Sequence, residues 1–234
     1  MVRRTKEEAL ETRDRILDTA EQVFSERGVA RTSLADIADA AGVTRGAIYW
    51  HFKNKGDLFS AMLDRVALPM EERIRQAADE STADPLSSLR ACCVYVLRQT
   101  AEQSQCRRVF DILTRKCEHV EDVEDVDNLG ARILECRTQG LAMIERSLRN
   151  AVRRGQLPRH LDPRRAALGL HAYVNGLLYD WLMDPVSFEL AGEAEPLVDL
   201  YLAGLKAAPE LRRAGSLERN AFAASTPAAS AASE

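Results

Sequence analysis

The stretch from Thr32 to Lys55, TSLADIADAAGVTRGAIYWHFKNK, has the spacing of two short helices joined by a tight turn. Ser33 and Asp36 form a capping-box pattern at the start of the first helix. Gly42 ends that helix, because only glycine enters the left-handed conformation of a sharp turn without steric cost. Thr44 then caps the second helix. The stretch predicts a helix-turn-helix, whose second helix offers its first turn to a DNA major groove.

Apolar residues in this stretch are spaced so that they share one face of each helix. Ile48 and Phe52, four residues apart, are expected to face the core. Gly46, Tyr49 and Trp50 turn away from it. We interpret Trp50 as a packing residue, since indoles commonly wedge between helices. On the first helix, the residues expected inside are Leu34, Ile37, Ala38 and Ala41.

Together with the preceding ILDTAEQVFSERG, the stretch resembles the DNA-binding head of TetR-type repressors, and within them the AcrR and TtgR branch that represses multidrug efflux pumps. The match is close over about residues 1–65 and continues more weakly, for example as AVRRGQLP from Ala151 to Pro158. The resemblance implies an all-α homodimer with two domains in each chain. These are an N-terminal three-helix helix-turn-helix DNA-binding domain at residues 1–55 and a C-terminal helical ligand-binding and dimerisation domain at 56–208.

The resemblance also implies which residues contact a palindromic, double-stranded operator. Arg45 and Gly46 match positions that face base edges, where an arginine can donate two hydrogen bonds to guanine and a glycine lets the backbone approach. Thr32 and Ser33, at a helix N-terminus, can offer hydroxyls and amides to a phosphate. The remaining positions hold phosphates in the family: Thr44, Tyr49, His51 and Lys55. For His51, a capping or packing role remains an alternative.

The net charge of −4 does not by itself indicate a nucleic-acid partner. The basic groups are local, however, because Arg31, Arg45 and Lys53 flank the motif, and affinity for DNA should fall with salt. Near the N-terminus, Arg3, Arg4 and Lys6 could reach a minor groove or simply remain solvated. No apolar run approaches the roughly 20 residues that span a bilayer. We therefore expect a soluble, cytoplasmic protein without a membrane partner.

The rest of the chain is rich in Ala, Leu, Arg and Glu, which favour helix. Pro69 is expected to kink the helix that follows Lys55, or to separate two helices there. Helices are expected at about residues 6–27, 55–79, 85–103, 105–118, 126–154, 163–183 and 195–207. The acidic stretch Glu118–Asp127 is expected to be a solvated loop or helix start. Residues 209–234 form an Ala/Ser-rich tail that is expected to be disordered.

The helix at 163–183 is apolar on more than one face, so it needs two packing partners. With the helix at 195–207 it resembles the family's dimerisation pair. If the family fold holds, the helices between Leu86 and Tyr179 enclose a pocket whose apolar walls suit a small hydrophobic or aromatic, antibiotic-like effector. The candidate lining residues are Cys92, Cys93, Val96, Phe110, Leu113, Thr114, Cys117, Gly140, Met143, Ile144, His171, Val174, Asn175, Leu178 and Tyr179. Among them His171, Asn175 and Tyr179 are the candidates for hydrogen bonds.

Two other classes of function are alternatives to a ligand-responsive repressor. A redox or metal sensor would act through Cys92 and Cys93, or through Cys117 and His119, but the five cysteines form no C-x-x-C pair. An α-helical enzyme would need a nucleophile with a base, a phosphate loop or paired carboxylates, and none stands at recognisable spacing. We therefore assign no catalytic residue, metal or cofactor.

Overall fold

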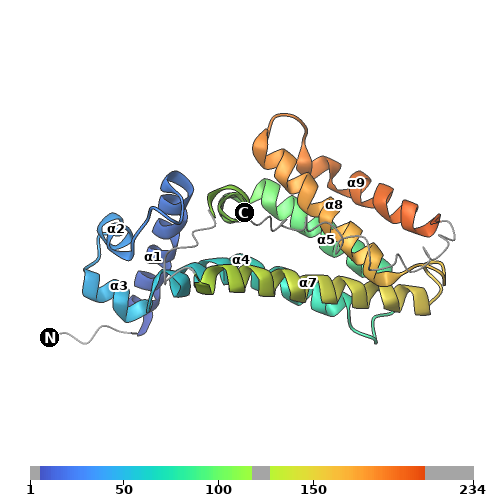
Figure 1. Cartoon of the computed structure of the whole chain (residues 1–234), viewed down its shortest axis with the longest axis horizontal. Coiled ribbons are helices and arrows are strands. Elements are labelled where there is room, and N and C mark those ends of the chain that lie inside the picture. The colour runs from blue at the N-terminus through green and yellow to red at the C-terminus, as the bar shows by residue number, and fades with distance from the viewer. Residues whose placement is uncertain (1–5, 118–126, 209–234) are drawn as a thin grey trace, which may run out of the picture.

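A computed structural model describes residues 6–117 and 127–208, and within these ranges all the regular secondary structure is helical. Figure 1 shows α1, α2 and α3 together at one end, while α5, α8 and α9 gather at the other. The long helices α4 and α7 pack side by side and run beneath α5 and α8 in this view. The elements are α1 (Lys6–Arg27), α2 (Leu34–Ala40), α3 (Arg45–His51), α4 (Lys55–Ala77), α5 (Pro85–Glu102), α6 (Ser104–Asp111), the π-helical turn η1 (Ile112–Lys116), α7 (Asp127–Arg153), α8 (Pro163–Met183) and α9 (Leu190–Lys206). The all-α fold expected from the sequence is confirmed.

The helix-turn-helix begins and ends at the residues that the sequence indicated. Ser33 accepts a hydrogen bond from the Asp36 backbone while the Asp36 carboxylate accepts one from the Ser33 backbone, so the capping box is complete. Gly42 has a φ of 64°, in the left-handed region, and Thr44 caps α3 by accepting from the Ala47 amide. Local hydrogen-bond chemistry therefore sets the lengths of both helices.

One hydrophobic cluster lies beneath this motif. Phe24 of α1, Ile37 of α2 and Ile48 of α3 are all completely buried in it. Val109 of α6 and Ile112 of η1, far along the chain, are completely buried in the same cluster. The core of the head therefore includes residues from the segment that was expected to belong to the second domain.

The helix α4 runs without interruption from Lys55 to Ala77 with Pro69 inside it. The alternative of two separate helices is therefore excluded. Because proline has no amide hydrogen, the carbonyl of Arg65, four residues earlier, receives no helical hydrogen bond from position 69.

A second hydrophobic cluster fills the other end of the molecule. It joins buried leucines of α5, α7 and α8, such as Leu89, Leu148 and Leu170, to Val198 of α9. The hydroxyl of Tyr201 on α9 donates to the Ala166 carbonyl of α8 at 3.2 Å. A side chain at Gly169 would collide with that hydroxyl, so this glycine permits the close approach of α8 and α9.

Two expected helices differ from the structure. The single helix expected at 105–118 is α6 followed by the π-helical turn η1. Periodicity does not distinguish a π turn from an α turn over five residues, so this feature was not visible in the sequence. The last helix begins at Leu190 rather than near Glu195, because Glu189 caps it by accepting from the Gly192 amide and Leu190 is buried.

Several predictions fall on residues that the structure does not describe. They include the basic pair Arg3 and Arg4, residues 118–126 of the acidic stretch with His119, and the tail at 209–234.

Replacing Ser33 with alanine should lower the free energy of unfolding by about 1 kcal/mol, because the Asp36 amide in the first turn of α2 loses its capping partner. Ser33→Thr keeps the oxygen acceptor and serves as the matched control. Urea unfolding followed by circular dichroism measures both variants. Equal stability of the alanine variant and the wild type would contradict a structural role for the capping box.

Candidate nucleic-acid interface

The first turn of α3 presents its side chains to solvent. Arg45 and Gly46 are exposed directly after the Thr44 cap, and Tyr49 is 57% exposed. Trp50 is 72% exposed, so the interpretation of this indole as a wedge between helices was wrong. It lies two residues from the buried Ile48, on the opposite side of the helix. The surface thus combines a guanidinium, a bare stretch of backbone and two aromatic rings.

His51 was predicted either to contact a phosphate or to cap or pack within the protein, and the structure shows packing contacts of its ring. The side chain is half-buried, and its ring meets the Trp50 ring edge-on with centroids 4.5 Å apart. It also lies against the Phe52 ring, with a centroid distance of 6.2 Å. These contacts position the imidazole at the end of α3.

A cleft of about 440 Å³ lies where the N-terminus of α2, the end of α3 and the start of α4 meet. Four of the predicted phosphate-binding residues line it, namely Thr32, Ser33, Tyr49 and Lys55. Among the other lining residues, which the predicted site did not include, are two cations and an amide: Arg31, Lys53 and Asn54.

Hydrogen bonds within the protein shape this cleft. Lys55 donates from Nζ to the Val29 carbonyl at 2.9 Å, and the Thr32 hydroxyl donates to the Gly28 carbonyl at 2.8 Å. Thr32 is 2% exposed, so its hydroxyl holds the turn together. The hydrogen bond from the Ser33 side chain, followed by that from its backbone, lowers the pKa of Asp36. The exposed cations Arg31 and Lys53 are therefore the freer partners for a phosphate, and their place beside the motif was the signal available in the sequence.

The candidate effector-binding residues are not all brought together. Cys93, Ile144 and Leu178 are buried in the second hydrophobic cluster, with Val96 and Val174 packed against it. Leu113 and Cys117 pack instead against the cluster of the head, and Phe110 contacts both clusters. Thr114, Asn175 and Tyr179 are exposed, and His171, whose pKa is lowered by burial and then by the Arg137 charge, is half-buried. The predicted set therefore spans two cores and an outer face.

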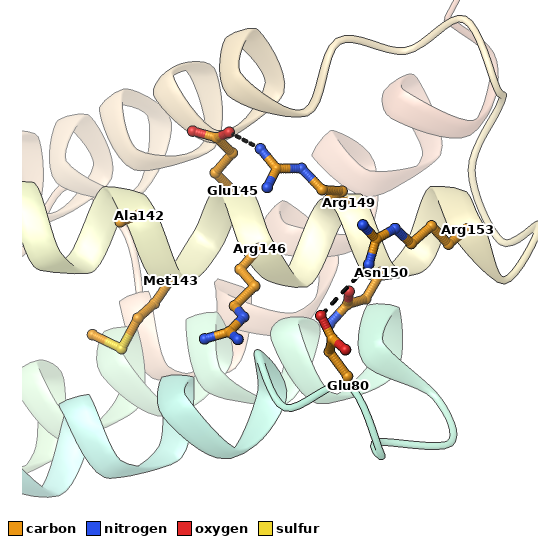
Figure 2. Close-up of a pocket in the computed structure, with 8 residues that line it drawn as sticks. All are labelled: Glu80, Ala142, Met143, Glu145, Arg146, Arg149, Asn150 and Arg153. Atoms are coloured by element: carbon orange, nitrogen blue, oxygen red, sulfur yellow. Dashed lines mark hydrogen bonds and ion pairs between the residues drawn. The ribbon is translucent and has the colours of Figure 1, made fainter.

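A pocket of about 460 Å³ opens between α7 and the residues that follow α4 (Figure 2). Its walls are mostly charged: Glu145 pairs with Arg149, and Arg153 lies 3.5 Å from Glu80. Of the candidate effector-binding residues, only Met143 lines it. The observed pocket and the predicted apolar chamber therefore do not coincide.

The surroundings of the five cysteine thiols favour a packing role over redox chemistry. Burial raises the pKa of Cys92 to about 11 and that of Cys93 to about 12, and it raises the pKa of Cys117 to about 11. Burial also raises the pKa of Cys106 and Cys136. Because the thiolate is the reactive form, these shifts disfavour a cysteine sensor. Within the described ranges there is no group of three or more potential metal ligands, and no helix is long and apolar enough to cross a membrane.

Comparison with known protein families separates the chain into two matching parts. Residues 16–62 match "Bacterial regulatory proteins, tetR family", which includes the helix-turn-helix. Residues 84–207 match "MAATS-type transcriptional repressor, C-terminal region". The resemblance carried by the sequence is confirmed.

Individual relatives match along nearly the whole chain. The HTH-type transcriptional regulator TtgR of Pseudomonas putida is 45% identical over 91% of this chain and all of its own length. NalD, the secondary repressor of the MexAB-OprM multidrug efflux pump in Pseudomonas aeruginosa, superposes with a TM-score of 0.75 at 36% identity, covering 87% of this chain and 100% of its own. A complex of SmeT with triclosan gives 0.76 at 33% identity over 86% and 95%. SmeT represses the SmeDEF multidrug efflux pump of Stenotrophomonas maltophilia.

Thiol labelling should follow burial. At pH 8, a thiol with the pKa of Cys92, about 11, is ionised in only about one molecule in a thousand, so Cys92 and Cys93 should resist iodoacetamide in the native protein. The half-buried Cys106 and Cys136 should react sooner, and all five should react in urea. Site-resolved mass spectrometry measures this order. Rapid native labelling of the Cys92-Cys93 pair would instead favour the redox sensor.

Proposed function

Because this chain belongs to the tetR family of bacterial regulatory proteins, we propose that it represses an operon by binding a palindromic operator as a homodimer, and that a small hydrophobic or aromatic compound releases it. The exposed first turn of α3, with Arg45 and Gly46 beside a cationic cleft, is the observation that carries this proposal. By similarity to NalD and SmeT, the regulated genes encode a multidrug efflux pump. A repressor of this kind works in the cytoplasm and catalyses no reaction.

The geometry supports two separate roles in DNA recognition, base contacts from the first turn of α3 and phosphate contacts from the neighbouring cleft. Arg45 at the tip of α3 reads a guanine, and the missing side chain of Gly46 admits the groove edge. Arg31, Lys53 and Lys55 surround the neighbouring cleft, where a backbone phosphate would be held. Thr32, Ser33 and Thr44 act mainly by setting the helix ends that aim these groups.

Apolar side chains left uncovered on α8 and α9 support the homodimer. Leu168, Tyr179 and Met183 follow one stripe of α8, spaced by about three turns and then about one turn, and are each about half exposed, at 53%, 46% and 53%. Leu200 on α9 is 69% exposed. A second copy of the chain would bury these residues in a self-complementary, two-fold interface. Two heads bound to successive major grooves must lie about 34–36 Å apart.

The effector is proposed to act through the helices α5 to α8. Triclosan, which is bound in the SmeT complex, belongs to the apolar, aromatic class that the sequence predicts. Phe110, in contact with both hydrophobic clusters, is the predicted lining residue best placed to report such a compound to the head. Asn175 and Tyr179 lie on the exposed side of α8, so their contact with an effector stays a prediction.

A gel-shift titration on the DNA upstream of the gene tests the proposal. Wild-type protein should shift this DNA, and Arg45→Ala should bind it with an affinity weaker by about 1–3 kcal/mol, the value of one bidentate contact to a guanine. Adding triclosan and other aromatic antibiotics should release the wild type. Failure of the wild type to bind this or neighbouring promoters would overturn the proposal, and release by oxidant alone would favour the cysteine sensor.

Gly46→Ala separates folding from recognition. A β-carbon at this position would meet the Thr44 Oγ1 atom at 3.9 Å, an ordinary contact, and alanine is the better helix former by up to about 1 kcal/mol. The variant should therefore be as stable as the wild type but lose most of its operator affinity, because the methyl group enters the DNA interface. Thermal unfolding and the same gel shift measure the two effects. Full operator binding by this variant would place Gly46 outside the interface.

A further inference from the structure

A carboxylate is buried at the junction between the head and the rest of the molecule. Glu21 of α1 is 0% exposed, and three side chains from two other helices surround it. Gln105 of α6 donates to it from Nε2 at 2.8 Å, while Arg65 of α4 and Arg108 of α6 each approach it at 3.4 Å. Three helices therefore meet on one carboxylate.

The balance of these contacts depends on α6. Charge-assisted hydrogen bonds are usually about 2.7–2.9 Å long, so both arginines lie beyond the favourable distance. Arg65 is closer to Asp18, at 2.7 Å, and the buried Nε of Arg108 has no hydrogen-bond partner. The single short hydrogen bond to Glu21 comes from Gln105. Burial raises the pKa of Glu21 although both arginines and Gln105 oppose that shift.

A second connection ties the same two parts together. The Val29 amide, in the turn after α1, donates to the Lys116 carbonyl at the end of η1 with a distance of 3.2 Å. Val109 and Ile112 of this segment are buried in the core of the head. On its other side, α6 contacts α8, since the Arg107 guanidinium lies 4.7 Å from the centre of the Trp181 ring. Contacts of α6 and η1 thus connect α8 on one side with α1 and the turn after it on the other.

The neighbouring backbone is suited to movement. The π-helical geometry of η1 is uncommon and is often found at functional positions. In α4, Pro69 withholds a hydrogen bond from the carbonyl of Arg65, the residue that also contacts Glu21. Regular α-helical hydrogen bonding is therefore interrupted both in α4, at the carbonyl of Arg65, and directly after α6, in η1.

We propose that Glu21 is a positioning residue, and that its carboxylate is the joint through which α6 sets the position of the DNA-binding head. When α6 moves, Gln105 and Arg108 leave together, and Glu21 keeps only Arg65, which it shares with Asp18. A buried charge that loses its partners is strongly unfavourable, so α1 and α4 must rearrange to follow it. The consequence for operator binding rests on the function proposed above, whereas the joint itself does not.

The test compares full-length Glu21→Gln and Gln105→Ala with the wild type. Glu21→Gln keeps the shape of the side chain but removes the charge that attracts both arginines. Asp64→Asn is the matched control, because it neutralises the residue next to Arg65 and breaks an ion pair of 2.6 Å to Arg132 on α7 rather than the contacts to α6. Hydrogen-deuterium exchange of residues 24–32 and 105–117 and operator affinity are measured for each variant.

Exchange in these two segments should be about tenfold faster in Glu21→Gln and Gln105→Ala, and unchanged in Asp64→Asn. Operator affinity should fall about tenfold or more, within the usual range of coupling between sites, while affinity for a single half-site stays the same because α3 is untouched. The double variant should lose less than the sum of the two single losses, since both changes act on the contacts of the same side chain. The half-site measurement distinguishes positioning from general destabilisation.

Wild-type exchange rates in Glu21→Gln would overturn the proposal, as would equal effects in Asp64→Asn. Equal loss of affinity for the full operator and the half-site would show a merely structural role. If the wild type binds no operator, the proposed repressor function fails, and the exchange measurement alone still decides whether Glu21 joins α6 to the head.

Discussion

A helix of seven residues has little stability of its own in water, so the recognition surface of α3 depends on the apolar packing beneath it. Ile48 and Phe52 point inward and are buried in the cluster that contains Phe24 of α1. The Arg13 guanidinium covers the outer side of the Phe52 ring at 5.2 Å. This packing lets one side of α3 hold the helix while the opposite side, with Arg45 and Tyr49, is left exposed for the proposed contact with DNA.

The same cluster prevents the head from being an independent module. Its core is completed by Val109 and Ile112, which arrive from α6 and η1 after the chain has already passed through α4 and α5. The head therefore shares part of its hydrophobic core with α6 and η1. In a family whose members regulate transcription, this shared core is the physical connection through which an effector is proposed to act on DNA binding. Glu21 contributes the polar contacts of the connection, and Phe110 contributes apolar contacts to both clusters.

The C-terminal part has two kinds of surface with different chemistry. Between α7 and the residues after α4, arginines and glutamates line a charged pocket (Figure 2). Such a pocket suits a polar ligand better than an aromatic effector. On α8 and α9, by contrast, leucines, Tyr179 and Met183 stand uncovered. These exposed apolar residues at helical spacing are the surface that the proposed homodimer would cover. No cysteine lines the charged pocket or is among these exposed apolar residues. Burial raises the pKa of each thiol and so favours its protonated form.

Much of this protein could be predicted from its sequence wherever the controlling chemistry is local. The capping box at Ser33, the left-handed turn at Gly42 and the buried pair Ile48 and Phe52 depend on residues only a few positions apart, and the structure confirms each of them. Tertiary structure decided the rest: the exposure of Trp50, the π turn at Ile112–Lys116 and the meeting of Glu21 with Arg65 and Arg108. These features arise from packing between segments far apart in the chain, and helical periodicity carries no information about which partner a face will meet.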